Sequence, residues 1–126
     1  MARRAKFEIS GRFPSLNEYI GVCRRNKYRA NQMKRRETSR AASAARGVDP
    51  FTGPVVVSFL WVEQDRRRDL DNIAFAKKFV LDGLVEAGVI ENDNARHVVG
   101  LRDEFSYDKQ NPHVEVVIEE WDETAR

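Results

Sequence analysis

Three arginines and two aspartates lie side by side in the segment Arg66-Arg67-Arg68-Asp69-Leu70-Asp71-Asn72. Carboxylates bind hard divalent cations such as Mg²⁺, and a run of guanidinium groups binds phosphate. The segment therefore offers both a metal ligand set and a grip on an anionic substrate, which is what cleavage of a phosphodiester requires. A further pair, Asn92-Asp93, follows an amphipathic helical stretch. A helix can carry the chain away and a loop can return it, so we expect this pair near the first aspartates.

Helical spacing adds a lysine to the aspartates. If a helix begins at Asp71, Lys78 and Asp82 return to the same stripe because each residue advances by ~100°. Lys78 can then reach a phosphate bound near Asp71 and neutralise charge on its oxygens, whereas Lys77 lies off the stripe. The helix N-terminus itself favours phosphate. The alternative interpretation of Asp-x-Asp is a plain helix start, because Asp is a good cap.

Charge is segregated along the chain although the formal net charge is only +2. Glu37 is the one acid in the basic segment from Arg24 to Arg46, whereas the stretch from Glu115 to Arg126 is mainly acidic. Such a domain can present a polyanion-binding face. The alternative is a solvated helix face, but a second basic run beside paired aspartates favours nucleic acid. We expect the DNA backbone to be contacted by Arg24, Arg25, Lys27, Arg29, Lys34, Arg35, Arg36, Arg66, Arg67 and Arg68.

Size and composition predict a single domain over residues 1–126, with about 122–126 as a flexible acidic tail. Hydrophobic residues make up 41% of the chain and charged residues 33%, as in a soluble globular protein. No apolar run approaches the ~20 residues of a membrane span, and no signal peptide is recognisable. The lone Cys23 excludes an internal disulfide. We expect a cytoplasmic protein.

The elements that must position these residues follow from periodicity. Phe7 and Ile9 alternate with polar residues and predict a half-buried first strand. A short helix follows Pro14, and a basic helix over about 30–46 ends at Gly47. The run 55–62 is apolar on both faces, as in a central strand covered on both sides.

The second half of the chain predicts one helix and two strands. Asp69 or Asp71 caps a helix that ends at Gly88. Strands at about 97–105 and 114–118 form a hairpin through 108–112. The order β-α-β-α-β-β predicts an α/β fold of mixed α+β character, in which helices flank a mixed sheet.

Three stretches together carry a family resemblance. Arg67-Arg68-Asp69-Leu70-Asp71-Asn72, Lys78-Phe79-Val80-Leu81-Asp82-Gly83-Leu84 and Ala87-Gly88-Val89-Ile90-Glu91-Asn92-Asp93 resemble the RusA family of Holliday junction resolvases. The upstream Phe13-Pro14-Ser15-Leu16-Asn17-Glu18-Tyr19 resembles the family's Pro-Ser-x-Asn segment, and we count Asn17 among the DNA-contacting residues. The resemblance covers about residues 6–120.

The resemblance implies a RusA-like fold and a homodimeric endonuclease that depends on Mg²⁺, with Mn²⁺ as a substitute and no other cofactor. Such an enzyme nicks four-way DNA junctions symmetrically during recombination and repair. By the same resemblance, Asp69, Asp71 and Asp93 bind the metal and Lys78 is the catalytic lysine. A phage or prophage origin in a bacterial host fits the family.

The chain departs from the family pattern at two positions. The family's lysine falls where Phe75 stands here, and alignment on Leu81-Asp82 implies an insertion over 73–75 that selects Lys78 over Lys77. The first member of the family's Asp-Asp pair is Asn92 here, either a weaker ligand or a turn residue. Two other functions stay open: a non-catalytic DNA-binding or phage accessory protein that keeps the fold, and a nuclease for other branched DNA.

Overall fold

A single four-stranded sheet forms the centre of the structure, a computed structural model that describes residues 2–122. The strands are β1 (Arg4–Ser10), β2 (Val55–Glu63), β3 (Val98–Tyr107) and β4 (His113–Glu120), in the spatial order β1-β4-β2-β3. β2 is parallel to β3 and antiparallel to β4, which is antiparallel to β1. The predicted mixed sheet is confirmed. The predicted tail lies outside the described residues except for Asp122.

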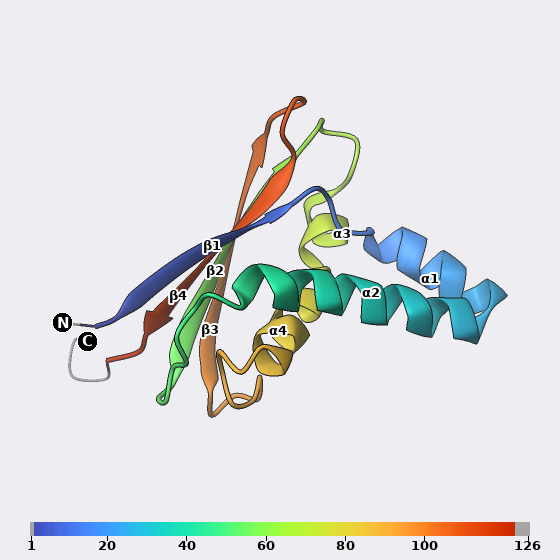
Figure 1. Ribbon diagram of the computed structural model, residues 1–126. Helices are drawn as coiled ribbons and strands as arrows, with labels where there is room; N and C mark the ends of the chain where they lie inside the picture. Colours follow the sequence, from blue (N-terminus) through green and yellow to red (C-terminus); the bar gives the residue numbers. More distant parts are fainter. Residues whose placement is uncertain (1, 123–126) are drawn as a thin grey trace.

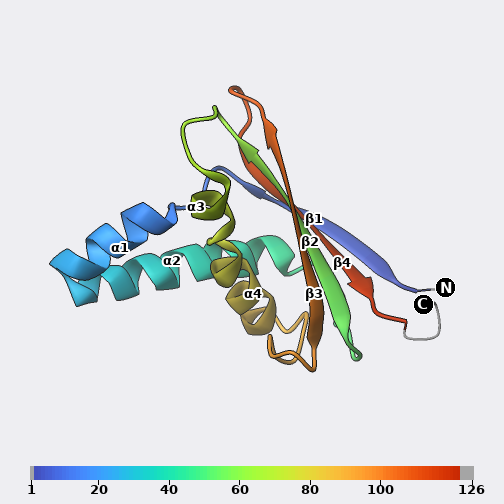
Figure 2. The same ribbon diagram turned by 180° about the vertical axis from the view of Figure 1, so that it is seen from behind.

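The helices are α1 (Leu16–Arg25), α2 (Lys27–Ala45), α3 (Leu70–Ala74) and α4 (Lys77–Glu86). All of them lie on the same side of the sheet (Figures 1 and 2). The predicted order β-α-β-α-β-β holds, with each helical region divided into two helices. None of the helices in the described part of the chain is long and apolar enough to cross a membrane.

The core lies between the helices and the inner face of β2. Val55, Val57, Phe59 and Trp61 point into it and are at most 2% exposed. The alternate residues of β2 face the other side, where no described helix lies (Figure 2). The sequence predicted that β2 is covered on both faces. Helices cover one face, and the side chains of neighbouring strands cover the other.

The predicted hairpin between the last two strands was wrong. β3 and β4 follow each other in the chain, but β2 lies between them and pairs with both. β2 is the most apolar strand, so the central position, with neighbours on both edges, buries it best. The turn at 108–112 therefore spans β2, and the Asp108 N–H donates to the Glu63 carbonyl at 2.8 Å.

The predicted continuous helix after Asp71 was also wrong. α3 ends at Ala74, the chain turns at Phe75 and Ala76, and α4 begins at Lys77. Buried Ile73, Ala76 and Phe79 keep a helical apolar spacing across the break. No Pro or Gly marks it, so the sequence pattern reads as one helix. Phe75 and Ala76 both keep right-handed helical dihedrals, so the break is a tightened turn, and the angular argument from Asp71 to Lys78 stays a prediction.

α1 and α2 form an arm that extends away from the sheet (Figures 1 and 2). Ser15 begins α1 with a capping box, in which its hydroxyl accepts from the Glu18 N–H and the Glu18 carboxylate accepts from the Ser15 N–H. Asn26 separates the two helices and caps α2 by accepting from the Tyr28 and Arg29 N–H groups. The basic N-terminal part of α2 is thereby held at the far end of the arm.

Gly83 allows α2 and α4 to pack closely. A Cβ at this position would lie 2.7 Å from the Ala41 Cβ, 2.8 Å from the Ala42 nitrogen and 3.0 Å from the Thr38 carbonyl oxygen. Two of these atoms belong to helix backbone and cannot move independently. The contact fixes the distance between the arm and α4, which carries Lys78.

Gly83→Ala is expected to lower the free energy of unfolding by about 1–3 kcal/mol, because the added methyl overpacks the interface. Gly21→Ala is the matched control, since Gly21 is also helical and its Cβ would meet nothing within 4 Å. That change should raise the free energy of unfolding by up to about 1 kcal/mol through helix propensity. Urea denaturation of both variants measures the difference, and equal effects would contradict the close packing.

Candidate active site

Lys78 joins two carboxylates at the start of α4. Its Nζ lies 3.1 Å from Asp82 Oδ1, one helical turn on, and 3.1 Å from Asp93 Oδ2 in the loop between α4 and β3. The hydrogen bonds to Asp82 and then Asp93 raise the pKa of Lys78. The lysine therefore stays a cation at neutral pH. The structure thus places together two of the residues predicted for the site, Lys78 and Asp93, although they are distant in sequence.

The neighbouring Lys77 points in a different direction. Its ammonium pairs with Asp103 Oδ2 on β3, and Asp103 Oδ1 accepts a hydrogen bond from Trp61 Nε1 at 2.8 Å. Lys77 and Asp103 side chains are only 24% and 22% exposed. These contacts tie α4 to the sheet and give Lys77 a structural task. Of the two lysines, Lys78 is the one available to a substrate.

The structure weakens the helix-cap explanation for the aspartate pair. Asp69 occupies the N-cap position of α3, yet its side chain makes no capping hydrogen bond. Asp71 lies in the first turn, and its Oδ1 accepts only a local bond from the Asn72 N–H at 3.0 Å. Both residues are exposed. Their carboxylates are therefore oriented toward solvent, where a cation and a phosphate could reach them.

Three carboxylates suit Mg²⁺, which prefers oxygen ligands and keeps several waters. Asp69, Asp71 and Asp93 offer this donor chemistry, and the Asp93 carboxylate already faces the Lys78 cation. In residues 2–122, however, these three do not gather their oxygens within 4.8 Å of one another. The residue types of these three side chains still fit the metal.

Asn92 acts as a turn residue in this structure. Its side-chain Oδ1 accepts from the Asp93 N–H at 2.7 Å, which fixes the loop just before the carboxylate. Of the two roles that the sequence left open for Asn92, the turn role has this direct support.

The arginine run divides into one half-buried and two exposed side chains. Arg68 donates to the Phe13 carbonyl at 2.8 Å and pairs with Glu18 and Glu63, and its side chain is 17% exposed. Arg67 is 88% exposed. The Arg66 guanidinium lies 4.3 Å from the centre of the Tyr107 ring. Arg68 is thus engaged within the protein, whereas Arg67 is the member best placed to meet DNA.

The arm presents most of the predicted DNA-contacting residues to solvent. Exposed members are Asn17, Arg24, Arg25, Lys27, Arg29, Lys34, Arg35 and Arg36. Among them stands Tyr28, an aromatic residue that is 71% exposed. Lys34 and Arg35 also line a groove between α2 and α4 that includes Asp82, the partner of Lys78. Because Glu86 lines it as well, the groove carries both bases and acids, and it connects the basic arm to the partner of Lys78.

Four residues that hold the site together were given no role in the sequence analysis. Asp82 was visible as the residue four positions after Lys78, a spacing at which opposite charges pair on a helix. Glu18 was visible through the Ser-x-x-Glu capping box. Glu63 and Asp103 gave no local signal, because their partners Arg68 and Lys77 come from other parts of the chain.

The family model described as endodeoxyribonuclease RusA matches residues 14–119. A search of curated proteins found no match. Among solved structures, a chain in the crystal structure of a HypE-HypF complex is similar with a TM-score of 0.37 and 11% identity, over 94% of this chain and 31% of that one. The chain thus spans under a third of that protein, and the likeness carries no argument.

Replacing the two neighbouring lysines should separate their tasks. Lys77→Met leaves the partly buried Asp103 without its cation and should lower the free energy of unfolding by about 1–3 kcal/mol. Lys78→Met removes an exposed side chain and should change it by no more than about 0.5 kcal/mol. Thermal or urea denaturation checks this. A larger loss for Lys78→Met than for Lys77→Met would contradict the assignment.

Proposed function

The chain belongs to the RusA family of endodeoxyribonucleases, and from this premise we propose that it resolves four-way DNA junctions by paired, symmetric nicks in a reaction that depends on a divalent metal. The observation that carries the proposal is the contact of Lys78 with Asp93, which unites the predicted lysine and a predicted metal ligand. The proposed setting is recombination and repair in the cytoplasm of a bacterial host, from a phage or prophage gene.

Asp69, Asp71 and Asp93 are the proposed Mg²⁺ ligands, and Mn²⁺ would fit the same oxygens. When bound, the metal supplies polarisation of the scissile phosphate and a water of lowered pKa. The exposed positions of Asp69 and Asp71 at the start of α3 suit ligands that must meet a large substrate. Asp93 arrives from the loop after α4, where the side chain of Asn92 holds the turn.

Lys78 is proposed to neutralise charge that develops on the phosphoryl oxygens. It is suited to this task because its raised pKa keeps the ammonium protonated. Asp82 holds the lysine at a spacing of one helical turn. The lysine therefore keeps one anchor when Asp93 turns toward a metal, and it remains directed at the substrate.

DNA is proposed to lie along the arm and the groove between α2 and α4, with Lys34 and Arg35 next to Asp82. Contacts from lysine and arginine to phosphates position DNA without reading its sequence. Selectivity for a four-way junction would then come from a homodimer, in which two such sites face opposite strands. The alternatives are a DNA-binding protein without catalysis and a nuclease for other branched DNA.

Replacement of Asp71 tests the proposed metal site. With a labelled four-way junction in Mg²⁺, wild type should make paired nicks. Asp71→Asn should cut more than ~100-fold more slowly, because loss of a metal ligand should exceed the 10–100-fold effect of losing an outer-shell group. In Ca²⁺ both proteins should still bind the junction in a gel shift. Asp49→Asn is the matched control, an exposed aspartate in the loop before β2.

Each outcome of that assay decides between functions. Binding without cleavage by wild type, over a range of Mg²⁺ and Mn²⁺, would support the non-catalytic alternative. Equal cleavage of flaps, forks and four-way junctions in competition would support the broader nuclease. Full activity of Asp71→Asn would remove Asp71 from the proposed metal site.

The arginine run yields a second prediction. Arg67→Ala should weaken junction binding and reduce the slope of log affinity against log salt by about 0.9, the effect of one lost phosphate contact. Arg68→Ala should instead lower the free energy of unfolding by about 1–3 kcal/mol, because Glu63 then keeps only Arg12 as a partner. Gel shifts at several salt concentrations and urea denaturation measure the two effects. A reversed pattern would place Arg68 rather than Arg67 on the DNA.

A further inference from the structure

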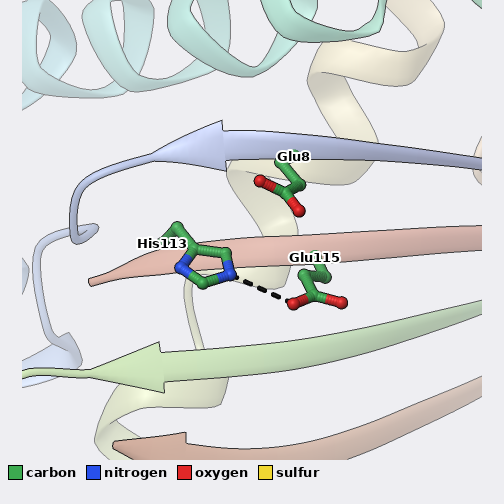
Figure 3. A group of neighbouring side chains, drawn as sticks. All are labelled: Glu8, His113 and Glu115. Atoms are coloured by element: carbon green, nitrogen blue, oxygen red, sulfur yellow. Dashed lines mark hydrogen bonds and ion pairs between the residues drawn. The ribbon is translucent and has the colours of Figure 1, made fainter. Parts of the chain in front are cut away.

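Glu8, His113 and Glu115 gather on the face of the sheet opposite the helices (Figure 3). Glu8 of β1 pairs directly with Glu115 of β4, and His113 stands two residues earlier on the same face of β4. One ligand atom of each residue lies within 4.8 Å of the others. Within residues 2–122 this is the group of His, Cys, Asp and Glu side chains that meets such a spacing.

Both nitrogens of the His113 ring face hydrogen-bond acceptors. Nδ1 lies 2.8 Å from the Asn111 carbonyl oxygen, so Nδ1 must carry a proton and donate it. Nε2 lies 3.1 Å from Glu115 Oε2. A neutral ring in this tautomer would direct its lone pair at a carboxylate, which is repulsive. A cation must therefore occupy Nε2, and it is either a second proton or a metal ion.

The separation of the two atoms matches an N–H···O hydrogen bond, and it also matches two ligands of one metal ion. Bonds of about 2.1 Å from one ion to a histidine nitrogen and a carboxylate oxygen give a 3.1 Å separation at an angle of roughly 95°. This is the angle between neighbouring ligands in octahedral coordination. The bond from Nδ1–H to a backbone carbonyl is also the usual means of orienting a metal-binding histidine. Glu8 supplies a third donor from the adjacent strand.

We propose that Glu8, His113 and Glu115 form a binding site for a divalent transition-metal ion of the Zn²⁺ and Co²⁺ class. An imidazole beside two carboxylates favours such ions over Mg²⁺, which prefers oxygen ligands alone. The site is separate from Lys78 and Asp93, which lie on the helix side. It joins β1 to β4 close to Ser10, after which the chain leaves the sheet for the arm.

Lys6 sets an internal test of the proposal. Its ammonium lies 2.9 Å from Glu115 Oε1, the oxygen not facing His113, and its side chain is 52% exposed. A bound divalent ion would be repelled by this charge and would compete with it for Glu115. Lys6→Gln should therefore tighten metal binding several-fold. If Glu8, His113 and Glu115 bind only protons, Lys6→Gln would lose the ion pair with Glu115 and metal affinity would not increase.

The experiment titrates the full chain, first freed of metal with a chelator, with Zn²⁺ by calorimetry and with Co²⁺ by visible absorption. We expect one Zn²⁺ to be bound, and an affinity at least tenfold lower in His113→Asn. His97→Asn is the matched control, because His97 has Nδ1 2.8 Å from the Asn94 side-chain oxygen and Nε2 3.7 Å from Glu91, yet within residues 2–122 it belongs to no group of three potential ligands. Glu8→Gln changes an exposed side chain and should weaken binding without disturbing the fold.

Several outcomes would overturn the site. These are no Zn²⁺ binding by wild type, unchanged binding in both His113→Asn and Glu8→Gln, or an equal loss in His97→Asn. Asp71→Asn should keep its Zn²⁺ affinity, and Glu8→Gln should keep wild-type nicking in Mg²⁺. Failure of the nuclease proposal would therefore leave this test intact, and failure here would leave the nuclease proposal intact.

Discussion

The buried carboxylate of Glu63, at the end of the central strand, is the constraint on which the arrangement of the site depends. The residue is 4% exposed, and a carboxylate removed from water needs cationic partners. Arg12 and Arg68 provide them at 3.3 and 3.6 Å. Arg68 also bonds to the Phe13 carbonyl and to Glu18 at the start of α1. One buried charge thereby joins β2, the start of the arm and the loop that leads to the aspartates.

This constraint explains why three consecutive arginines take different roles. Because Arg68 must turn inward, the backbone that precedes Asp69 is fixed and Arg67 is directed outward. The same division occurs on α4, where Lys77 is held by Asp103 against the sheet and Lys78 faces Asp93. In both pairs a structural contact of one residue sets the orientation of its neighbour. The exposed member of each pair also keeps contacts of its own, Lys78 with Asp82 and Asp93 and Arg67 with Asp65 at 3.7 Å.

Local patterns predicted the elements well and their assembly less well. The alternation of Phe7 and Ile9, the apolar run of β2 and the basic helix all appear as expected, because each depends on nearby residues. The placement of β2 between β3 and β4 depends on which strand gains most from burial. That comparison involves the whole sheet and cannot be made from the residues of one segment. The break after Ala74 was hidden because the apolar spacing continues through it.

In the candidate site, too, local features could be predicted and contacts between distant segments could not. Lys78 was selected from the sequence by family alignment and by helical spacing. The spacing argument assumed one regular helix, whereas the contact with Asp93 is a separate observation of the folded chain that supports the selection. Asp69 and Asp71 could be found from the sequence because the two carboxylates are only one residue apart. Partners that meet only in the folded chain, such as Glu63 with Arg68, could not.

Charge segregation gives the molecule two unlike faces. The arm places its basic residues on the helix side, whereas the opposite face of the sheet carries the acids Glu8, Glu104, Glu115 and Glu119 interleaved with the bases Arg4, Lys6 and Arg102. A polyanion is attracted to the basic arm, while the charges of the sheet face are nearly balanced. A net charge of only +2 is therefore compatible with DNA binding. The same separation keeps a cation held by Glu8 and Glu115 away from the DNA, so it can act on the sheet without competing for phosphate.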